Sequence, residues 1–278
     1  MNKFQGVSTM SKDVTTPAAE EEKAQDTAIT ETSSTSTTLA EQNTAPMGFE
    51  DEEAGDLIIP RIKVIQTLSP ERKDGIASEG DILNSLTKDR LNGKTFIPVF
   101  KFNNNIDWKP RSEGGGIQCS ASDGKKGETS DGRQLICASC RRCEFDNTKQ
   151  GKEALPKCTK YINFFGFLEG EKMPIILSFA KTNYNEGKKL YSLARVTMQN
   201  MWNYGYTLNE KLVAKNSNEW YIINTAAHGA TSYEDRQLGL QLFQMYRNTI
   251  GTLKYDLDEA VGAEESFNPA VSSASTEF

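Results

Sequence analysis

Five cysteines, all between residues 119 and 158, constrain this chain more than any other feature. They follow the spacing Cys119-x17-Cys137-x2-Cys140-x2-Cys143-x14-Cys158. Their number is odd, and the N-terminus lacks the apolar run of a signal peptide. We therefore expect reduced thiols that bind a metal rather than a framework of disulfides.

This spacing is typical of a structural zinc site. A Cys-x2-Cys turn can bring two sulfurs onto one tetrahedral ion, and one cysteine from each flank completes the four ligands. The ion would supply folding free energy to two long loops that have little apolar core. We predict a structural Zn2+ held by Cys119, Cys137, Cys140 and Cys158, with Cys143 as a possible substitute if the 140/143 pair is the one used. An iron–sulfur cluster and five unrelated buried thiols are the alternatives.

Charge divides the chain into three parts. Residues 1–56 carry twelve acidic and three basic side chains, a net charge of −9, and residues 256–278 carry six acidic and no basic ones, a net charge of −6. Residues 57–255 carry 29 Lys/Arg against 20 Asp/Glu, a net charge of +9. A basic body attracts a polyanion, and a tethered acidic tail competes for the same surface. Solvation of the tails is the alternative explanation.

The two ends have few large apolar residues, so we expect them to be disordered. The predicted organisation is an acidic tail at 1–56, one basic β-rich domain at 57–255 with a metal knuckle at 119–158, and an acidic tail at 256–278.

Period-two patterns predict most of the body to be strands. We expect strands at 62–66, 94–102, 204–214 and 218–227, and a hairpin at 160–181 with its turn at Glu171-Lys172. Pro98 indicates an edge strand or a bulge, and the cysteine segment reads as loop-dominated. Helices are predicted within 185–202 and 231–253, the second with a capping box of Thr231 and Glu234. The predicted fold class is β-rich α+β, a small OB-like barrel with an inserted cysteine knuckle and two helices.

The strand at 161–169 is apolar on both of its faces. Either both faces are buried, or the one with Tyr161, Phe165 and Phe167 presents rings on which bases stack. Further aromatic and basic residues predicted to contact nucleic acid are Lys101, Trp108, Lys109, Arg111, Lys181, Lys188, Lys189 and Arg195. Together with the basic body they favour sequence-tolerant nucleic-acid binding, to DNA or to RNA.

Catalytic machinery is hard to find in the sequence. The single histidine, His228, has no general-base or ligand spacing to another group. Gly93-Lys94-Thr95 lacks the first glycine of a phosphate-binding loop, because Lys88 stands at that position, so we predict a turn that enters a strand. No apolar run approaches membrane-spanning length. We expect a non-enzymatic, soluble cytoplasmic protein, and a metal-dependent nuclease is the least favoured alternative.

Several segments resemble a run found in phage-encoded proteins. They are PRIKVIQTLSPE, GDILNSL, FIPVF, WKPRSEGGG and CSASDG, then a C-x2-C and Pro156-Lys157-Cys158, and the resemblance spans about residues 55–225. The plan is similar to that of the zinc-containing phage helix-destabilising proteins. Some of those bind zinc through one histidine and three cysteines, whereas no histidine lies near the cysteines here.

The resemblance implies an OB-type barrel that binds single-stranded DNA during phage replication and recombination. It also implies an acidic C-terminal tail that contacts replication proteins, with Phe278 as the partner-binding residue. The alternative is a phage virion-associated structural protein with a zinc-stabilised insertion, which accounts for the tails but not for the basic body.

Overall fold

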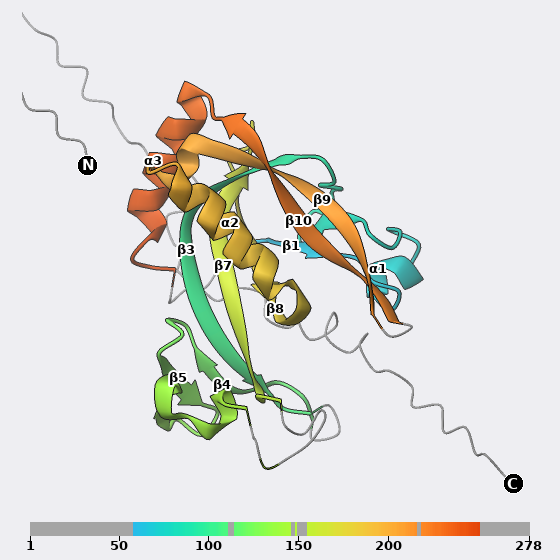
Figure 1. Ribbon diagram of the computed structural model, residues 1–278, viewed down its shortest axis with the longest axis vertical. Helices are drawn as coiled ribbons and strands as arrows, with labels where there is room; N and C mark the ends of the chain where they lie inside the picture. The colour runs from blue at the N-terminus through green and yellow to red at the C-terminus, as the bar shows by residue number, and fades with distance from the viewer. Residues whose placement is uncertain (1–57, 111–113, 146–147, 149–154, 216–217, 251–278) are drawn as a thin grey trace, which may run out of the picture. The chain divides into compact units, whose positions relative to one another are not determined.

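A computed structural model describes residues 58–110, 114–145, 148, 155–215 and 218–250. Ten strands run through these residues: β1 (Arg61–Val64), β2 (Ile82–Asn84), β3 (Thr95–Trp108), β4 (Ile117–Ala121), β5 (Lys126–Thr129), β6 (Gln134–Ile136), β7 (Cys158–Leu168), β8 (Pro174–Ala180), β9 (Tyr204–Lys215) and β10 (Asn218–Ala230). The α-helices are α1 (Pro70–Lys73), α2 (Tyr184–Val196) and α3 (Tyr233–Tyr246) (Figure 1). The predicted tails at 1–56 and 256–278 lie outside the described residues.

The strands form one mixed sheet in the order β2-β1-β8-β7-β3-β4-β5-β6, and the β9–β10 hairpin joins it at the first residues of β3. Only the β1–β8 pairing is parallel among the pairings of the described strands. The β-rich α+β prediction is confirmed. The predicted OB-type barrel differs from what the described residues form, because their hydrogen-bonded strand order does not close into a ring. Gln66, which follows β1, contacts Tyr221 of β10 through its side chain. Its Nε2 donates to the Tyr221 carbonyl at 2.7 Å, and its Oε1 accepts from the Tyr221 N–H at 3.0 Å.

β3 is the strand on which the sheet branches. One of its edges pairs with β7, while its other edge pairs first with β9 and, at the far end, with β4. Pro98 has no N–H to donate, and the register with β7 shifts between Pro98 and Phe100. Opposite Pro98 stands Gly166, where an added Cβ would lie 2.2 Å from the Ile97 carbonyl oxygen. The bulge confirms the sequence prediction for Pro98. Gly93, with φ of +77°, provides the turn that was predicted before Thr95.

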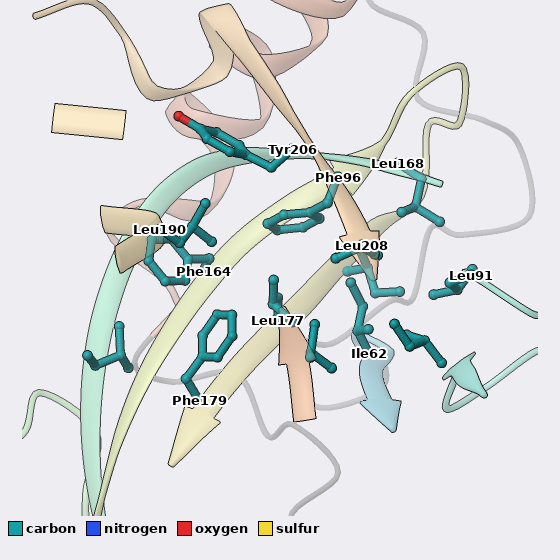
Figure 2. Packing of buried hydrophobic residues seen from close by; sticks show 14 of the residues in the cluster. Ile62, Leu91, Phe96, Phe164, Leu168, Leu177, Phe179, Leu190, Tyr206 and Leu208 are labelled. Atoms are coloured by element: carbon teal, nitrogen blue, oxygen red, sulfur yellow. The ribbon is translucent and has the colours of Figure 1, made fainter. Parts of the chain in front are cut away.

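The alternation of side chains along β7 divides the core into two clusters. On one face Phe164 packs with Leu177 and Phe179 of β8 and with Leu190 of α2 (Figure 2). On the other face Phe165 and Phe167 pack against α3 through Leu242 and its neighbours. Each face of the central strands is therefore covered by a helix that buries its apolar stripe.

The two helices predicted from the sequence are confirmed, and both are shorter than their patterns. The N-cap of α3 is Ser232, whose Oγ accepts a 3.0 Å hydrogen bond from the backbone N–H of Asp235 and donates to its Oδ2 at 2.8 Å. The predicted cap, Thr231, instead donates to the Trp202 carbonyl at 2.8 Å. Neither α1 nor the short strands β4, β5 and β6 were predicted, and those strands replace the expected loops of the cysteine segment.

Candidate functional site

Two of the five cysteines are brought together by strand register. Asp107 on β3 lies opposite Cys119 of β4 on one side and opposite Cys158 of β7 on the other. Residues directly opposite each other on neighbouring strands point to the same face of a sheet. Cys119 and Cys158 therefore flank Asp107 on one face, although they are far apart in the sequence.

The other three cysteines arrive on two consecutive 3-10 turns, Cys137–Ser139 and Arg141–Cys143. The N–H of Cys137 donates to the Lys125 carbonyl at 2.8 Å, and the N–H of Cys143 donates to the Cys140 carbonyl at 2.9 Å. The first bond holds the turns against the segment between β4 and β5, and the second closes the Arg141–Cys143 turn. As a result one pocket is lined by all five cysteines together with Asn105, Asp107, Ala121, Leu135 and Arg142.

Two further residues shape this pocket. Gly127 leaves room for the Cys119 thiol, since a Cβ there would lie 2.9 Å from the sulfur. Asp107 is 2% exposed and forms an ion pair with Arg142, which stands between Cys140 and Cys143 in the sequence. The hydrogen bond to Asp107 raises the pKa of Arg142. The ion pair thus ties the cysteine turns to β3, the central strand of the sheet.

Burial raises the pKa of the Cys119 and Cys143 thiols and raises the pKa of Cys158 to about 11. The thiols of Cys143 and Cys158 hydrogen-bond to each other. All five cysteines are free of disulfides in this structure. Because a metal ligand must be a thiolate, binding of a metal to this pocket would displace the protons.

The donor set suits a soft metal ion, but the side chains are not arranged around a common point. Among the residues that the structure describes, no group of three or more His, Cys, Asp or Glu side chains is placed to hold an ion. The pocket also contains Cys143, so it does not distinguish the spare thiol. The zinc site and its four ligands stay a prediction.

The structure places the predicted stacking aromatics in the core. Phe165 and Phe167 are 0% exposed, and Tyr161 is 5% exposed. Of the two alternatives for this strand, burial of both faces is therefore correct, because α3 covers the second face. These rings offer no face to a base. Trp108 is half-buried, and its Nε1 donates to the Tyr161 hydroxyl at 3.4 Å.

Most of the predicted cations lie at or near α2, and one, Lys109, follows the last residue of β3. Lys101 from β3 reaches α2, where its Nζ lies 5.2 Å from the centre of the Tyr191 ring. The other cations near α2 are Lys181, in the turn before it, and Lys188, Lys189 and Arg195 within it. Lys109 lies with Trp108 at the far end of β3. Arg111 and Phe278 lie outside the described residues.

Sequence reasoning missed two aromatic residues, Tyr184 and Tyr191. Both lie on α2, and Lys188 stands over the Tyr184 ring at 5.1 Å. The signal was present, because positions 184, 188, 191 and 195 recur at the spacing of one helix face. The pattern was not recognised because the apolar residues of the same helix recur with the same period.

Residues 25–251, most of the chain, match the family described as Pam3 phage gp34-like protein. The chain belongs to the Pam3 phage gp34-like family. The membership indicates a phage protein, as the sequence resemblance implied. No curated protein and no solved structure matches the chain significantly. None of its described helices is long and apolar enough to cross a membrane.

Proposed function

We propose that the protein binds single-stranded DNA without sequence preference during phage replication or recombination. The observation that supports it most is the charge division, +9 over residues 57–255 between ends of −9 and −6. A body of this charge attracts the phosphates of a nucleic acid, and acidic ends on the same chain compete with them. The proposal needs a basic surface and does not depend on a closed barrel.

Cations on one face of the sheet support the proposal. Along β3, Lys101, Asn103, Asn105 and Asp107 alternate with the residues of the opposite face, so they form one row. Lys160 of β7 pairs with Asn105 and is exposed beside this row. The row leads from α2 to the cysteine pocket, whose lining includes Asn105 and Asp107.

A structural zinc ion belongs to the proposal. Cys119, Cys137, Cys140 and Cys158 would hold it, with Cys143 as the substitute ligand. The ion would supply cross-linking rather than reactivity, since four thiolates leave no open coordination position. The cysteines themselves would fasten β4, β5 and β6 to β3 beside the DNA-binding face. In the same proposal the acidic segment at 256–278, with Phe278, recruits replication proteins and competes with DNA for the basic face.

Fluorescence anisotropy of a labelled oligo-dT tests the proposal directly. For about three phosphate contacts we expect the affinity to fall roughly twentyfold between about 50 and about 200 mM salt. Duplex DNA should fail to displace the oligonucleotide. A variant that ends at residue 255 should bind more tightly than the full chain, because the competing charge is gone.

Absence of binding at low salt, in protein with its metal content verified, would exclude the DNA-binding proposal. A virion-associated structural role would then become the favoured function. Equal displacement by duplex DNA would show a general polyanion binder instead of a single-strand binder.

A further inference from the structure

One face of α2 alternates cationic and aromatic side chains. Tyr184, Lys188, Tyr191 and Arg195 are separated by four, three and four residues, so they lie above one another on the helix. We call these four residues the α2 stripe. It is about 17 Å long at 1.5 Å per residue. Leu190 and Ala194 lie on the neighbouring face of the helix and are buried in the core, and Tyr184 packs partly against the same core. Lys188, Tyr191 and Arg195 are exposed.

The aromatic rings of the α2 stripe are already engaged by cations. Lys188 lies 5.1 Å from the Tyr184 ring centre, and Lys101 of β3 lies 5.2 Å from that of Tyr191. Tyr191 is 39% exposed, so part of its surface is accessible while Lys101 stands over it. Burial lowers the pKa of Lys101. Rings with cations beside them are what single-strand binders use, because a base stacks on the ring while the cation contacts its phosphate.

The cations of the α2 stripe are available to a ligand. In the part of the chain that the structure describes, neither Lys188 nor Arg195 forms an ion pair. Lys189, on a different side of the helix, is by contrast bonded to Glu186 at 3.3 Å and to Asn224 at 2.9 Å. The stripe therefore presents positive charge that intramolecular partners do not neutralise.

The basic surface continues from the α2 stripe along β3. The Nζ of Lys101 donates to Asn103 at 2.8 Å, and a Cβ on Gly124 would lie 3.3 Å from the Cβ of Asn103. Gly124 belongs to the turn between β4 and β5, where Lys125 and Lys126 are exposed. The carbonyl of Gly124 accepts a 3.0 Å hydrogen bond from Asn105. Lys101, Asn103 and Asn105 therefore connect α2 to the cysteine region through their side chains.

Two other aromatic side chains among the described residues are well exposed. Phe145, at 55%, has both an acidic neighbour, Glu144, and the cations Arg141 and Arg142 close to it in the sequence. Tyr233 is 71% exposed, but it begins α3 beside Glu234 and Asp235, whose charge repels phosphate. The aromatics Tyr161, Phe165 and Phe167 are buried. Tyr191, which is exposed, and Tyr184, which is partly buried against the core, each have a cation over the ring.

We infer that the α2 stripe is the base-stacking surface of the protein, on which bases of a single strand stack against Tyr191 and Tyr184 while Lys101, Lys188 and Arg195 contact its phosphates. The inference rests on the proposed function, because it names the part of the surface that binds the strand. It replaces the buried rings of β7 with a helix face as the aromatic element.

The test is oligo-dT binding by full-length protein carrying Tyr191→Leu, Tyr191→Phe or Tyr233→Leu. Leucine keeps apolar volume and removes the ring, so we expect Tyr191→Leu to weaken binding about tenfold. Tyr191→Phe keeps the ring and should bind within about twofold of the unaltered protein. The matched control Tyr233→Leu removes an exposed tyrosine from an acidic site and should leave the affinity unchanged.

An abasic oligonucleotide of the same length separates stacking from phosphate binding. It should bind the unaltered protein and Tyr191→Leu equally, because it has no base to stack. The double variant Lys188→Gln/Arg195→Gln should instead lower the slope of log affinity against log salt by about 1.4, since each phosphate that the protein no longer neutralises lowers it by about 0.7. Thermal unfolding of each variant checks that its fold is intact.

The outcomes distinguish the two proposals. Unaltered protein that binds oligo-dT while Tyr191→Leu binds it equally well would overturn the α2 stripe and leave DNA binding in place. Loss of binding by Tyr191→Phe as severe as by Tyr191→Leu would also overturn it, since the ring would not be the cause. Failure of the unaltered protein to bind oligo-dT would overturn DNA binding, and the stripe with it.

Discussion

The body of the sheet and its cysteine region are stabilised by different interactions. In the body, Phe164 and Phe165 are 0% exposed on opposite faces of β7, each within an apolar cluster covered by a helix. In the cysteine region, made of β4, β5, β6 and the turns to Cys143, Ile136 is 65% exposed. Its pocket is lined by five thiols and an ion pair, with Leu135 and Ala121 as the apolar lining residues. Apolar burial therefore stabilises the body, whereas the cysteine region has less of it, and we expect its stability to depend on what its sulfurs bind.

The largest effect is expected from a core substitution in the body. Phe164→Ala should lower the free energy of unfolding by about 3–5 kcal/mol, because it removes a buried ring and leaves a cavity. The ring packs edge-on against Phe179 at 5.9 Å between centroids, so the loss is not confined to one neighbour. Chemical denaturation followed by tryptophan fluorescence measures it.

The control for this substitution is Tyr233→Ala, which truncates a side chain that is 71% exposed and should change stability by less than about 0.5 kcal/mol. A loss below about 1 kcal/mol for Phe164→Ala would contradict the view that apolar burial dominates in the body.

The body is also the part that its sequence describes best. Alternating apolar residues and proline chemistry predict β3, the bulge at Pro98 and the hairpin of β7 and β8, because these depend on local pattern. The two helices follow for the same reason. The N-cap of α3 lies one residue after the predicted one. Thr231 and Ser232 each have an acidic residue three positions later, so the local sequence fits both as the cap. The hydrogen bond from Thr231 to the Trp202 carbonyl, which is a tertiary contact, decides between them.

The cysteine region illustrates what local pattern omits. The spacing of the cysteines predicts that their thiols converge. The alignment of Cys119, Asp107 and Cys158 side by side, however, depends on the register of β4, β3 and β7. The role of Asp107 as partner of Arg142 has no local signal at all. The sequence alone left open whether Phe165 and Phe167 are buried or exposed, for a related reason. An apolar second face of the strand indicates that another element covers it but does not identify that element as α3.

The second prediction tests whether the cysteine region depends on a metal. If zinc is bound, a free concentration about one hundred times the Kd stabilises the region by about 2.7 kcal/mol. Removal by a chelator should release one zinc per chain and speed amide exchange across β4, β5 and β6. Exchange at Phe164 and its neighbours in β7 should stay slow. Hydrogen exchange read by mass spectrometry, with zinc measured in parallel, gives both results.

Two cysteine variants sharpen this test. Cys140→Ser should abolish zinc binding, whereas Cys143→Ser should retain it, because Cys143 is the predicted spare ligand. If Cys143→Ser loses zinc while a serine variant of one of the other four cysteines retains it, that other cysteine is the spare thiol. Equal slow exchange in both regions after chelation would show that the cysteine region does not need a metal.

The smallest effect concerns an ion pair in the body. Glu71 of α1 is 5% exposed and pairs with Lys63 and, at 3.4 Å, with Lys88. Burial alone would raise the pKa of Glu71, but hydrogen bonds from Lys63 and Lys88 hold it below its ordinary value of 4.5. A carboxyl whose pKa is lower in the folded state stabilises the fold above the unfolded value, and that contribution is lost as the pH falls through the folded value.

Glu71→Gln should therefore lower the free energy of unfolding by about 1–2 kcal/mol at neutral pH, since it leaves Lys63 less well paired. The difference from the unaltered protein should begin to narrow as the pH falls below 4.5, where Glu71 of the unfolded chain takes up a proton, and should be lost once the pH falls below the lower pKa of the folded state. Urea denaturation at a series of pH values measures the narrowing. Glu171→Gln, in an exposed pair with Lys94 at 2.7 Å, is the matched control and should have little effect at any pH. A difference that stays constant across this range would mean that Glu71 stabilises the body through packing rather than through its charge.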